Sequence, residues 1–269
     1  MAYLGGKSKG ADHILRVLNH EMFDSHDFLE PFVGYAHILR RVVKKRSYSA
    51  GDVNPLLVML LKAIQSNTPL PTITRERYTE LRNQTDITLE RAVAAFQYSF
   101  NGKEWGGWVG GKNDTPTYAR LNGRIDNMAS SRKQYYDKLH DNPTFQATQL
   151  SCCSYEHITP FNQLCYVDPP YCSTTKYGAQ TFDSARFWER IRQWSLDNIV
   201  FVSEYQAPRD FVLVASHPKK CCIAGGHKQT TRMENLYTHH SLLPRLQRIP
   251  RPLAHTPSEA LVDLHPRST

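Results

Sequence analysis

The chain has 269 residues, 40% of them apolar and 22% charged, which is enough to bury one large core or two small ones. Its 33 basic and 25 acidic residues leave a net charge of +8, with a pI near 9.2. This excess favours a polyanionic partner, nucleic acid first, although charge alone leaves open a basic protein with no such partner.

Several classes of protein are excluded by what the sequence lacks. The longest apolar run, Leu56–Leu61, is far shorter than the roughly 18 residues of a membrane span. Residues 1–10 have no apolar segment that could act as a secretory signal, so we expect a cytoplasmic protein with reduced thiols. The six cysteines form no CxxC pair, and the zinc-deaminase signature is missing, so no metal site is expected.

The first part of the chain alternates between helical and strand patterns. Helices are predicted over residues 9–22 and from residue 38 to 43, and strands over Phe28–Phe32 and Tyr48–Val53. Asn54 suits an N-cap and Pro55 the first position of a third helix. This order predicts an α/β protein with a doubly wound, mostly parallel, Rossmann-like sheet.

The alternation stops after Pro69. Residues 75–100 and 118–140 are predicted to be helical, and residues 101–124 hold six of the 14 glycines and two of the four tryptophans. We therefore interpret residues 66–143 as an inserted, mainly helical subdomain, flanked by a sheet domain made of residues 1–65 and 144–243.

Sheet patterns return in the last part of the chain. Strands are predicted over residues 144–150, 164–167, 199–202, 221–223 and 236–240, with a turn at Gly225-Gly226. Asp183 is predicted to cap a helix that carries Phe187, Ile191 and Trp194. Residues 244–269 are proline-rich and are predicted to form a flexible tail.

The strongest chemical motif is Asp168-Pro169-Pro170-Tyr171, at the end of an apolar strand. The two prolines restrict the backbone and make a stiff loop at the carboxyl end of the strand, where open α/β sheets bind ligands. The Asp168 carboxylate and the Pro169 carbonyl could each accept an N–H from the amine of a base, and the Tyr171 ring could stack on it. An ordinary Pro-Pro turn is the alternative.

Together with other motifs, this tetrad resembles the D12 class of adenine-N6 DNA methyltransferases, the group that contains the Dam enzymes. The motifs are Tyr3-Leu4-Gly5-Gly6-Lys7, Glu30-Pro31-Phe32-Val33-Gly34, Gly51-Asp52-Val53-Asn54, the tetrad itself, Ser203-Glu204-Tyr205 and Thr231-Arg232-Met233-Glu234-Asn235-Leu236. They occur in the family's order and span residues 1–241. One departure is Tyr35-Ala36, where the family usually has a second glycine at the latter position.

The resemblance implies the cofactor, the substrate and the site. The cofactor would be S-adenosylmethionine, held by residues on the sheet domain: Tyr3, Lys7, Phe32, Gly34, Asp52 and Asp168. The catalytic residues would be Asp168, Pro169, Pro170 and Tyr171. The substrate would be an adenine flipped out of double-stranded DNA, because the amine cannot be reached inside a duplex. A partner restriction enzyme is compatible with the motifs.

The inserted block lies where the family has its target-recognition domain. Candidate DNA contacts in it are basic or aromatic: Lys103, Trp105, Lys112, Arg120 and Arg124. A solvated basic face is the alternative for each single residue. Other acceptors (cytosine N4, RNA adenine or a glutamine amide) and an inactive DNA-binding relative also remain open. A phosphate-binding loop at Gly6-Lys7-Ser8 is excluded, since the glycine it requires is replaced by Met1.

Overall fold

A seven-stranded sheet organises the computed structural model, which describes residues 7, 11–109, 119–121, 124–126, 128–170, 182–222 and 229–246. The strand order is β5-β2-β1-β6-β7-β9-β8. The strands are β1 (Asp27–Glu30), β2 (Tyr48–Asp52), β5 (Thr148–Cys152), β6 (Gln163–Val167), β7 (Ile199–Glu204), β8 (Phe211–Cys222) and β9 (Gln229–His239). The first five in the order are parallel, and β9 and β8 form an antiparallel hairpin at one edge. The predicted α/β class with a mostly parallel sheet is confirmed.

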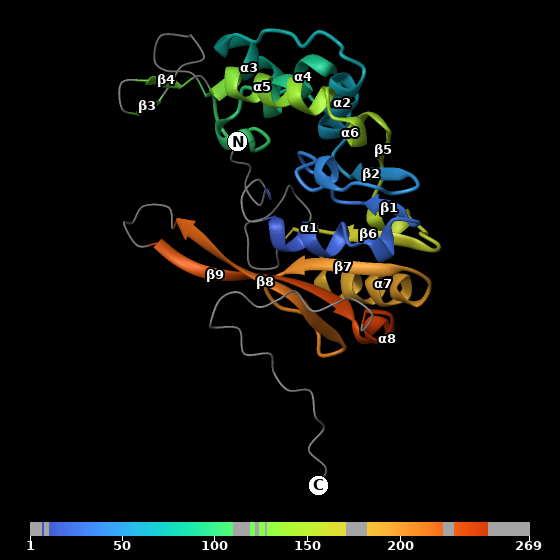
Figure 1. Ribbon diagram of the computed structural model, residues 1–269. Helices are drawn as coiled ribbons and strands as arrows, with labels where there is room; N and C mark the ends of the chain where they lie inside the picture. The colour runs from blue at the N-terminus through green and yellow to red at the C-terminus, as the bar shows by residue number, and fades with distance from the viewer. Residues whose placement is uncertain are drawn as a thin grey trace.

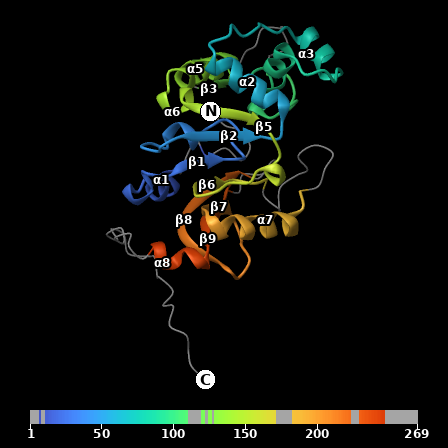
Figure 2. The ribbon, with the colours of Figure 1, turned by 90° about the vertical axis from the view of Figure 1, so that its right-hand side faces the viewer.

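Helices cover both faces of the sheet (Figure 2). On one face α1 (Asp12–Leu18) shares a buried cluster with Phe28, Tyr166 and Phe201. On the other, α7 (Ser184–Asp197) packs on Leu29, Cys165 and Val200, whose side chains alternate with the first set along the same strands. Strand order reverses between β1 and β6, so the switch point of the sheet lies there, where such folds bind ligands.

The inserted block is mainly helical, as predicted. After α2 (Pro55–Gln65) it contains α3 (Arg75–Arg82), α4 (Leu89–Phe96), a short hairpin of β3 (Ala119–Leu121) and β4 (Arg124–Asp126), and α5 (Met128–His140). Figure 1 places α3, α4 and α5 at the β5–β2 end of the sheet and the β8–β9 hairpin at the opposite end. The apolar side chains of the block join the same cluster as the α1 face of the sheet, so the two parts share one core.

The helix predicted over residues 38–43 is wrong: only a 3₁₀ turn, Leu39–Arg41, forms there. Side chains from a distant segment hydrogen-bond two carbonyls at the end of this turn. Asn142 donates to the Arg40 carbonyl at 2.9 Å, and Thr144 donates to the Val42 carbonyl at 3.0 Å. These tertiary contacts hold the chain after the turn in a loop, although its apolar residues have helical spacing.

Other boundaries also differ from the predictions. The helix over 9–22 shrinks to α1, followed by a 3₁₀ turn. The two strands β3 and β4 stand where the helix over 118–140 was expected to begin, and α6 (Pro143–Gln146) precedes β5. The helix over 75–100 is two helices, α3 and α4, and β8 starts ten residues before the predicted strand at 221. Part of the predicted tail is helix α8 (Leu243–Leu246), and residues 247–269 lie outside the described residues.

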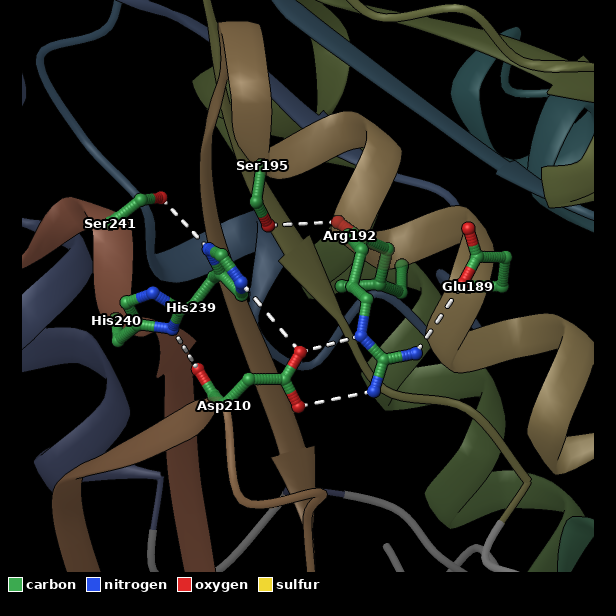
Figure 3. A network of polar contacts seen from close by, with 8 residues as sticks. Glu189, Arg192, Ser195, Asp210, His239, His240 and Ser241 are labelled. Carbon is green, nitrogen blue, oxygen red and sulfur yellow. Dashed lines mark hydrogen bonds and ion pairs between the residues drawn. The ribbon is translucent and has the colours of Figure 1, made fainter.

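A polar network fastens α7 to the hairpin edge (Figure 3). Arg192 donates two hydrogen bonds to the Asp210 carboxylate, at 2.5 and 3.0 Å. Those bonds lower the pKa of the Asp210 carboxyl. His240 and Asp210 also bond through backbone groups, from His240 N to Asp210 O at 2.9 Å. The network lies well away from the switch point and serves to fix the hairpin.

Candidate active site

Asp168 follows β6 directly, at the switch point. Its side chain is 18% exposed, Pro169 is buried and Pro170 is half-buried. The fourth residue of the tetrad, Tyr171, lies outside the described residues. The structure therefore positions the candidate catalytic carboxylate at the edge of the sheet where both flanking strands present their carboxyl ends.

Lys7 lies against this carboxylate. Its ammonium donates to both Asp168 oxygens, at 2.7 and 2.8 Å, and lies 2.8 Å from Oε1 of Glu234 on β9. Burial alone would lower the pKa of Lys7, but the charges of Asp168 and Glu234 outweigh that and raise it. Lys7 and Asp168, both predicted site residues, are thus brought together, and Glu234 is a partner that the motifs alone did not assign.

A row of carboxyl groups marks this edge of the sheet. Four adjacent parallel strands, β2, β1, β6 and β7, end at or next to Asp52, Glu30, Asp168 and Glu204, respectively. Burial, followed by the charge of Asp168, raises the pKa of Glu30 well above its ordinary value. Burial likewise raises the pKa of Glu204 to about 7. Acidic residues that end apolar strands were a signal in the sequence, because such groups are seldom buried without a functional or structural reason.

Asp52 lies beside Gly34, as expected for two residues of one pocket. Its carboxylate accepts from the Asn54 amide at 2.9 Å and from the Gly34 amide at 3.4 Å. Burial raises the pKa of Asp52, although these bonds act in the opposite direction. Asn54 also caps α2 as predicted, accepting from the amides of Leu56 and Leu57. The turn after β2 is therefore held firmly, with the Asp52 carboxylate at its start.

The two remaining cofactor candidates, Phe32 and Tyr3, are not shown in contact with Lys7, Asp52 or Asp168. Phe32 is half-buried in an aromatic cluster with Tyr155, Phe182 and Phe187, at centroid distances of 5.3 to 6.5 Å. Its ring thus lies on the α7 side of the sheet, whereas Lys7 precedes α1 on the other side. Tyr3 lies outside the described residues.

The DNA-contact candidates differ in their settings. Lys103 is exposed, whereas Trp105 is half-buried, packs against Tyr78 at 5.5 Å and lies under the Arg91 guanidinium at 5.3 Å. Arg120 lies on β3 and Arg124 on β4, where they belong to the short hairpin. Lys112 lies outside the described residues.

The inserted block touches both loops of the candidate cofactor pocket. The Tyr35 hydroxyl donates to the Gly102 carbonyl at 3.1 Å, and its ring stacks on Tyr136 of α5. The Asn54 amide donates to the Glu104 carboxylate at 2.6 Å. No local pattern predicts these contacts, since each joins segments about 50 or more residues apart.

Ala36, the departure from the family pattern, has a positive φ of 55° and is fully buried. A left-handed backbone favours glycine, and an alanine in it costs roughly 1–2 kcal/mol. The loop nevertheless keeps this conformation, in which Tyr35 is directed into the inserted block.

Two kinds of feature are absent from the described part of the chain. No helix there has both the length and the apolar character needed to cross a bilayer. No group of three or more histidine, cysteine or acidic side chains there could hold a metal ion.

Known proteins resemble this chain to different degrees. No curated protein matches the sequence. Among solved structures, a candidate RNA methyltransferase from Pyrococcus horikoshii is 8% identical with a TM-score of 0.39, covering 85% of this chain and 81% of that one. A candidate methylase from Haemophilus influenzae is 10% identical with a TM-score of 0.35, covering 86% and 88%. Such TM-scores are too low to establish a common fold.

The sequence model of one family matches almost the whole chain, over residues 3–247. That span contains the six motifs, the sheet with its carboxylate row and the inserted block. The chain therefore belongs to the D12 class of N6 adenine-specific DNA methyltransferases, and it is an enzyme that methylates adenine in DNA.

Proposed function

We propose that this enzyme transfers a methyl group from S-adenosylmethionine to the N6 amine of an adenine flipped out of duplex DNA, at the edge of the sheet where Asp168 lies. The observation that carries the proposal is the position of Asp168, directly after β6 at the switch point and backed by two prolines. A flipped base can reach this edge, whereas an adenine inside a duplex cannot present its amine.

The residues on this edge suit the cofactor. S-adenosylmethionine supplies an electrophilic methyl group on a positively charged sulfur. The Asp52 and Asp168 carboxylates at this edge are a favourable setting for such a cation. Asp52, next to the backbone of Gly34, is suited to accept the ribose hydroxyl groups, much as acidic residues after the second strand do in other nucleotide sites. Lys7, Phe32 and Tyr3 complete the proposed pocket.

Catalysis would depend on positioning and on hydrogen-bond acceptors. The lone pair of the adenine amine is delocalised into the ring, so the amine is a weak nucleophile. The Asp168 carboxylate and the Pro169 carbonyl would each accept one N–H, which localises the lone pair and aims it at the methyl carbon. A carbon–nitrogen bond forms as the carbon–sulfur bond breaks, and one amine proton leaves. Tyr171 would hold the base by stacking.

The inserted block would provide target recognition. Its exposed Lys103 lies between Gly102 and Glu104, which contact the two loops of the proposed cofactor pocket, and Arg120 and Arg124 lie on the β3–β4 hairpin. With Lys112 and Trp105, these residues would contact the DNA. Phosphate contacts would hold the duplex, and base contacts would choose the sequence.

Two variants test the assignment. Asp168→Ala should lower the single-turnover rate of adenine methylation by roughly 10²-fold or more while the protein stays folded, because a preorganised acceptor is lost. Asp52→Ala should instead weaken S-adenosylmethionine binding and leave cofactor-free DNA affinity nearly unchanged. The substrate sequence for these assays is found by methylating a random-sequence duplex library and mapping every modified adenine. A rate within threefold of the parent for Asp168→Ala would overturn the proposed catalytic role.

A further inference from the structure

One buried ammonium is shared between two carboxylates at the active-site edge. Lys7 is 2% exposed, and it contacts Asp168 at 2.7 Å and Glu234 at 2.8 Å. Glu234 is 1% exposed, whereas the Asp168 side chain is 18% exposed. Lys7 and Glu234 are thus a closed, buried ion pair, and Asp168 is the member of the trio that remains open towards the site.

The charge balance of the trio depends on Glu234. With both carboxylates ionised, the trio carries one net negative charge, and Asp168 is its more exposed carboxylate. Lys7 already donates to both Asp168 oxygens, so Glu234 acts on this pair through its charge: without that charge, Lys7 and Asp168 would form a neutral pair. A carboxylate in such a pair is a weaker acceptor, since the ammonium draws on the lone pairs that the adenine amine needs.

The strand that bears Glu234 is well fixed. β9 pairs with β8, where Glu234 lies opposite His217, and with β7 as far as Asn235, the residue next to Glu234. The next residue, Asn235, donates from its side chain to the Tyr205 carbonyl at 3.1 Å and to the Tyr237 hydroxyl at 2.9 Å. The Glu234 carboxylate therefore holds a constant place relative to the end of β7.

We propose that Glu234 is a positioning residue for methyl transfer: it holds the Lys7 ammonium and offsets its charge, so that Asp168 keeps the negative charge that makes it a strong acceptor for the adenine amine. This inference rests on the proposed role of Asp168. Glu234 itself touches neither the adenine nor the cofactor, and it acts through Lys7. It also gives the Thr231–Leu236 motif a specific task at the site.

The first test is Glu234→Gln, which preserves the shape of the side chain and removes its charge. With cofactor and DNA both saturating, the single-turnover rate should fall by roughly 10- to 100-fold, the factor that one charge-assisted hydrogen bond contributes to a barrier. The KM for S-adenosylmethionine should change by less than threefold. Glu234→Asp, which keeps the charge on a shorter side chain, should recover part of the rate.

The second test asks whether Glu234 acts through Lys7. The rate reduction in Glu234→Gln combined with Lys7→Met should be smaller than the product of the two single reductions, because with Lys7 absent there is no ammonium to draw on Asp168. Asp210→Asn is the matched control, since it breaks an ion pair that fixes the same hairpin far from Lys7. It should lower the melting temperature and leave the rate unchanged.

Each other outcome overturns the inference. A Glu234→Gln rate within threefold of the parent, reductions that multiply, or a reduction that Asp210→Asn reproduces would show that Glu234 is only structural. A raised KM with an unchanged rate would assign Glu234 to cofactor binding instead. If Asp168→Ala is inactive and Glu234→Gln is not impaired, only this inference fails; if Asp168→Ala remains active, the proposed function fails as well.

Discussion

The hydroxyl of Tyr35 donates a hydrogen bond of 3.1 Å to the carbonyl of Gly102, which joins the loop after β1 to the inserted block. Tyr35 is 1% exposed, and its ring stacks on Tyr136, so the contact is shielded from water. Glu104, two residues after Gly102, bonds Asn54 in the loop after β2. One segment of the inserted block therefore braces both loops of the proposed cofactor pocket.

The variant Tyr35→Phe tests what the hydrogen bond to Gly102 contributes to stability and to cofactor binding. The substitution keeps the ring and leaves the buried Gly102 carbonyl without this donor, which costs about 1–3 kcal/mol of unfolding free energy. Because the loop carries Gly34, affinity for S-adenosylmethionine should fall too. Urea unfolding and calorimetric titration measure the two effects. Unchanged stability and affinity together would mean that the bond contributes nothing.

Gly51→Ala should disturb the turn that carries Asp52. A Cβ at Gly51 would lie 2.9 Å from Oγ and 3.0 Å from the backbone oxygen of Ser151, its register partner on β5. Backbone cannot yield as a flexible side chain can, so we expect the free energy of unfolding to fall by roughly 1–3 kcal/mol and cofactor binding to weaken. Ser151→Ala would relieve only the side-chain half of the clash. A fully stable Gly51→Ala protein would show that β2 and β5 can separate at this point.

The DNA surface should respond to salt. Neutralising Lys103, Lys112, Arg120 and Arg124 together should weaken DNA binding and flatten its dependence on salt, by roughly 0.9 in log–log slope for each phosphate that the protein no longer neutralises. Cofactor affinity should not change. The control removes the same charge from exposed residues outside the inserted block: Arg16, Lys44, Arg186 and Arg209. Equal weakening in the two variants would mean that total charge, and not the inserted block, governs binding.

Stability should fall as pH rises through the range in which Glu204 ionises. Its pKa is raised by burial from 4.5 to about 7, so between these values the folded protein retains a proton that the unfolded chain has released. Below pH 4.5 the protonated Glu204 therefore contributes its full stabilisation. By pH 7 roughly 3 kcal/mol of that stabilisation is lost. Glu204→Gln should reduce this slope in urea unfolding from pH 5 to pH 8. The pKa of Glu30 is shifted in the same direction, so Glu30 should still cause part of the loss of stability with rising pH in this variant.

Sequence reasoning succeeded where the determinants are local. Asn54 and Pro55 start α2, and Asp183 caps α7 by accepting from the Arg186 amide, because caps act within a few residues. The sequence likewise placed Asp168 directly after a strand, because that position follows from consecutive residues.

It failed where distant segments decide the outcome. Residues 38–43 have a helical pattern, but the chain becomes extended at Val42, where Asn142 and Thr144 bond the Arg40 and Val42 carbonyls. Lys7 pairs with Glu234, a residue distant in the sequence, because the sheet places β9 beside β7 and β7 beside β6. Neither result could follow from periodicity, because only the folded chain brings those groups together.

The row of carboxyl groups at the strand ends lies within a chain whose overall charge is +8. ATP and S-adenosylmethionine share an adenosine, but one carries several negative charges and the other a positive sulfur. We expect the carboxylates of this row, Asp52 and Asp168 foremost, to favour the sulfonium and to disfavour the polyanion, so that charge discriminates between the two adenosine compounds. In a competition assay, adenosine should displace labelled cofactor far better than ATP does. Equal displacement would show that the row of carboxyl groups does not discriminate by charge.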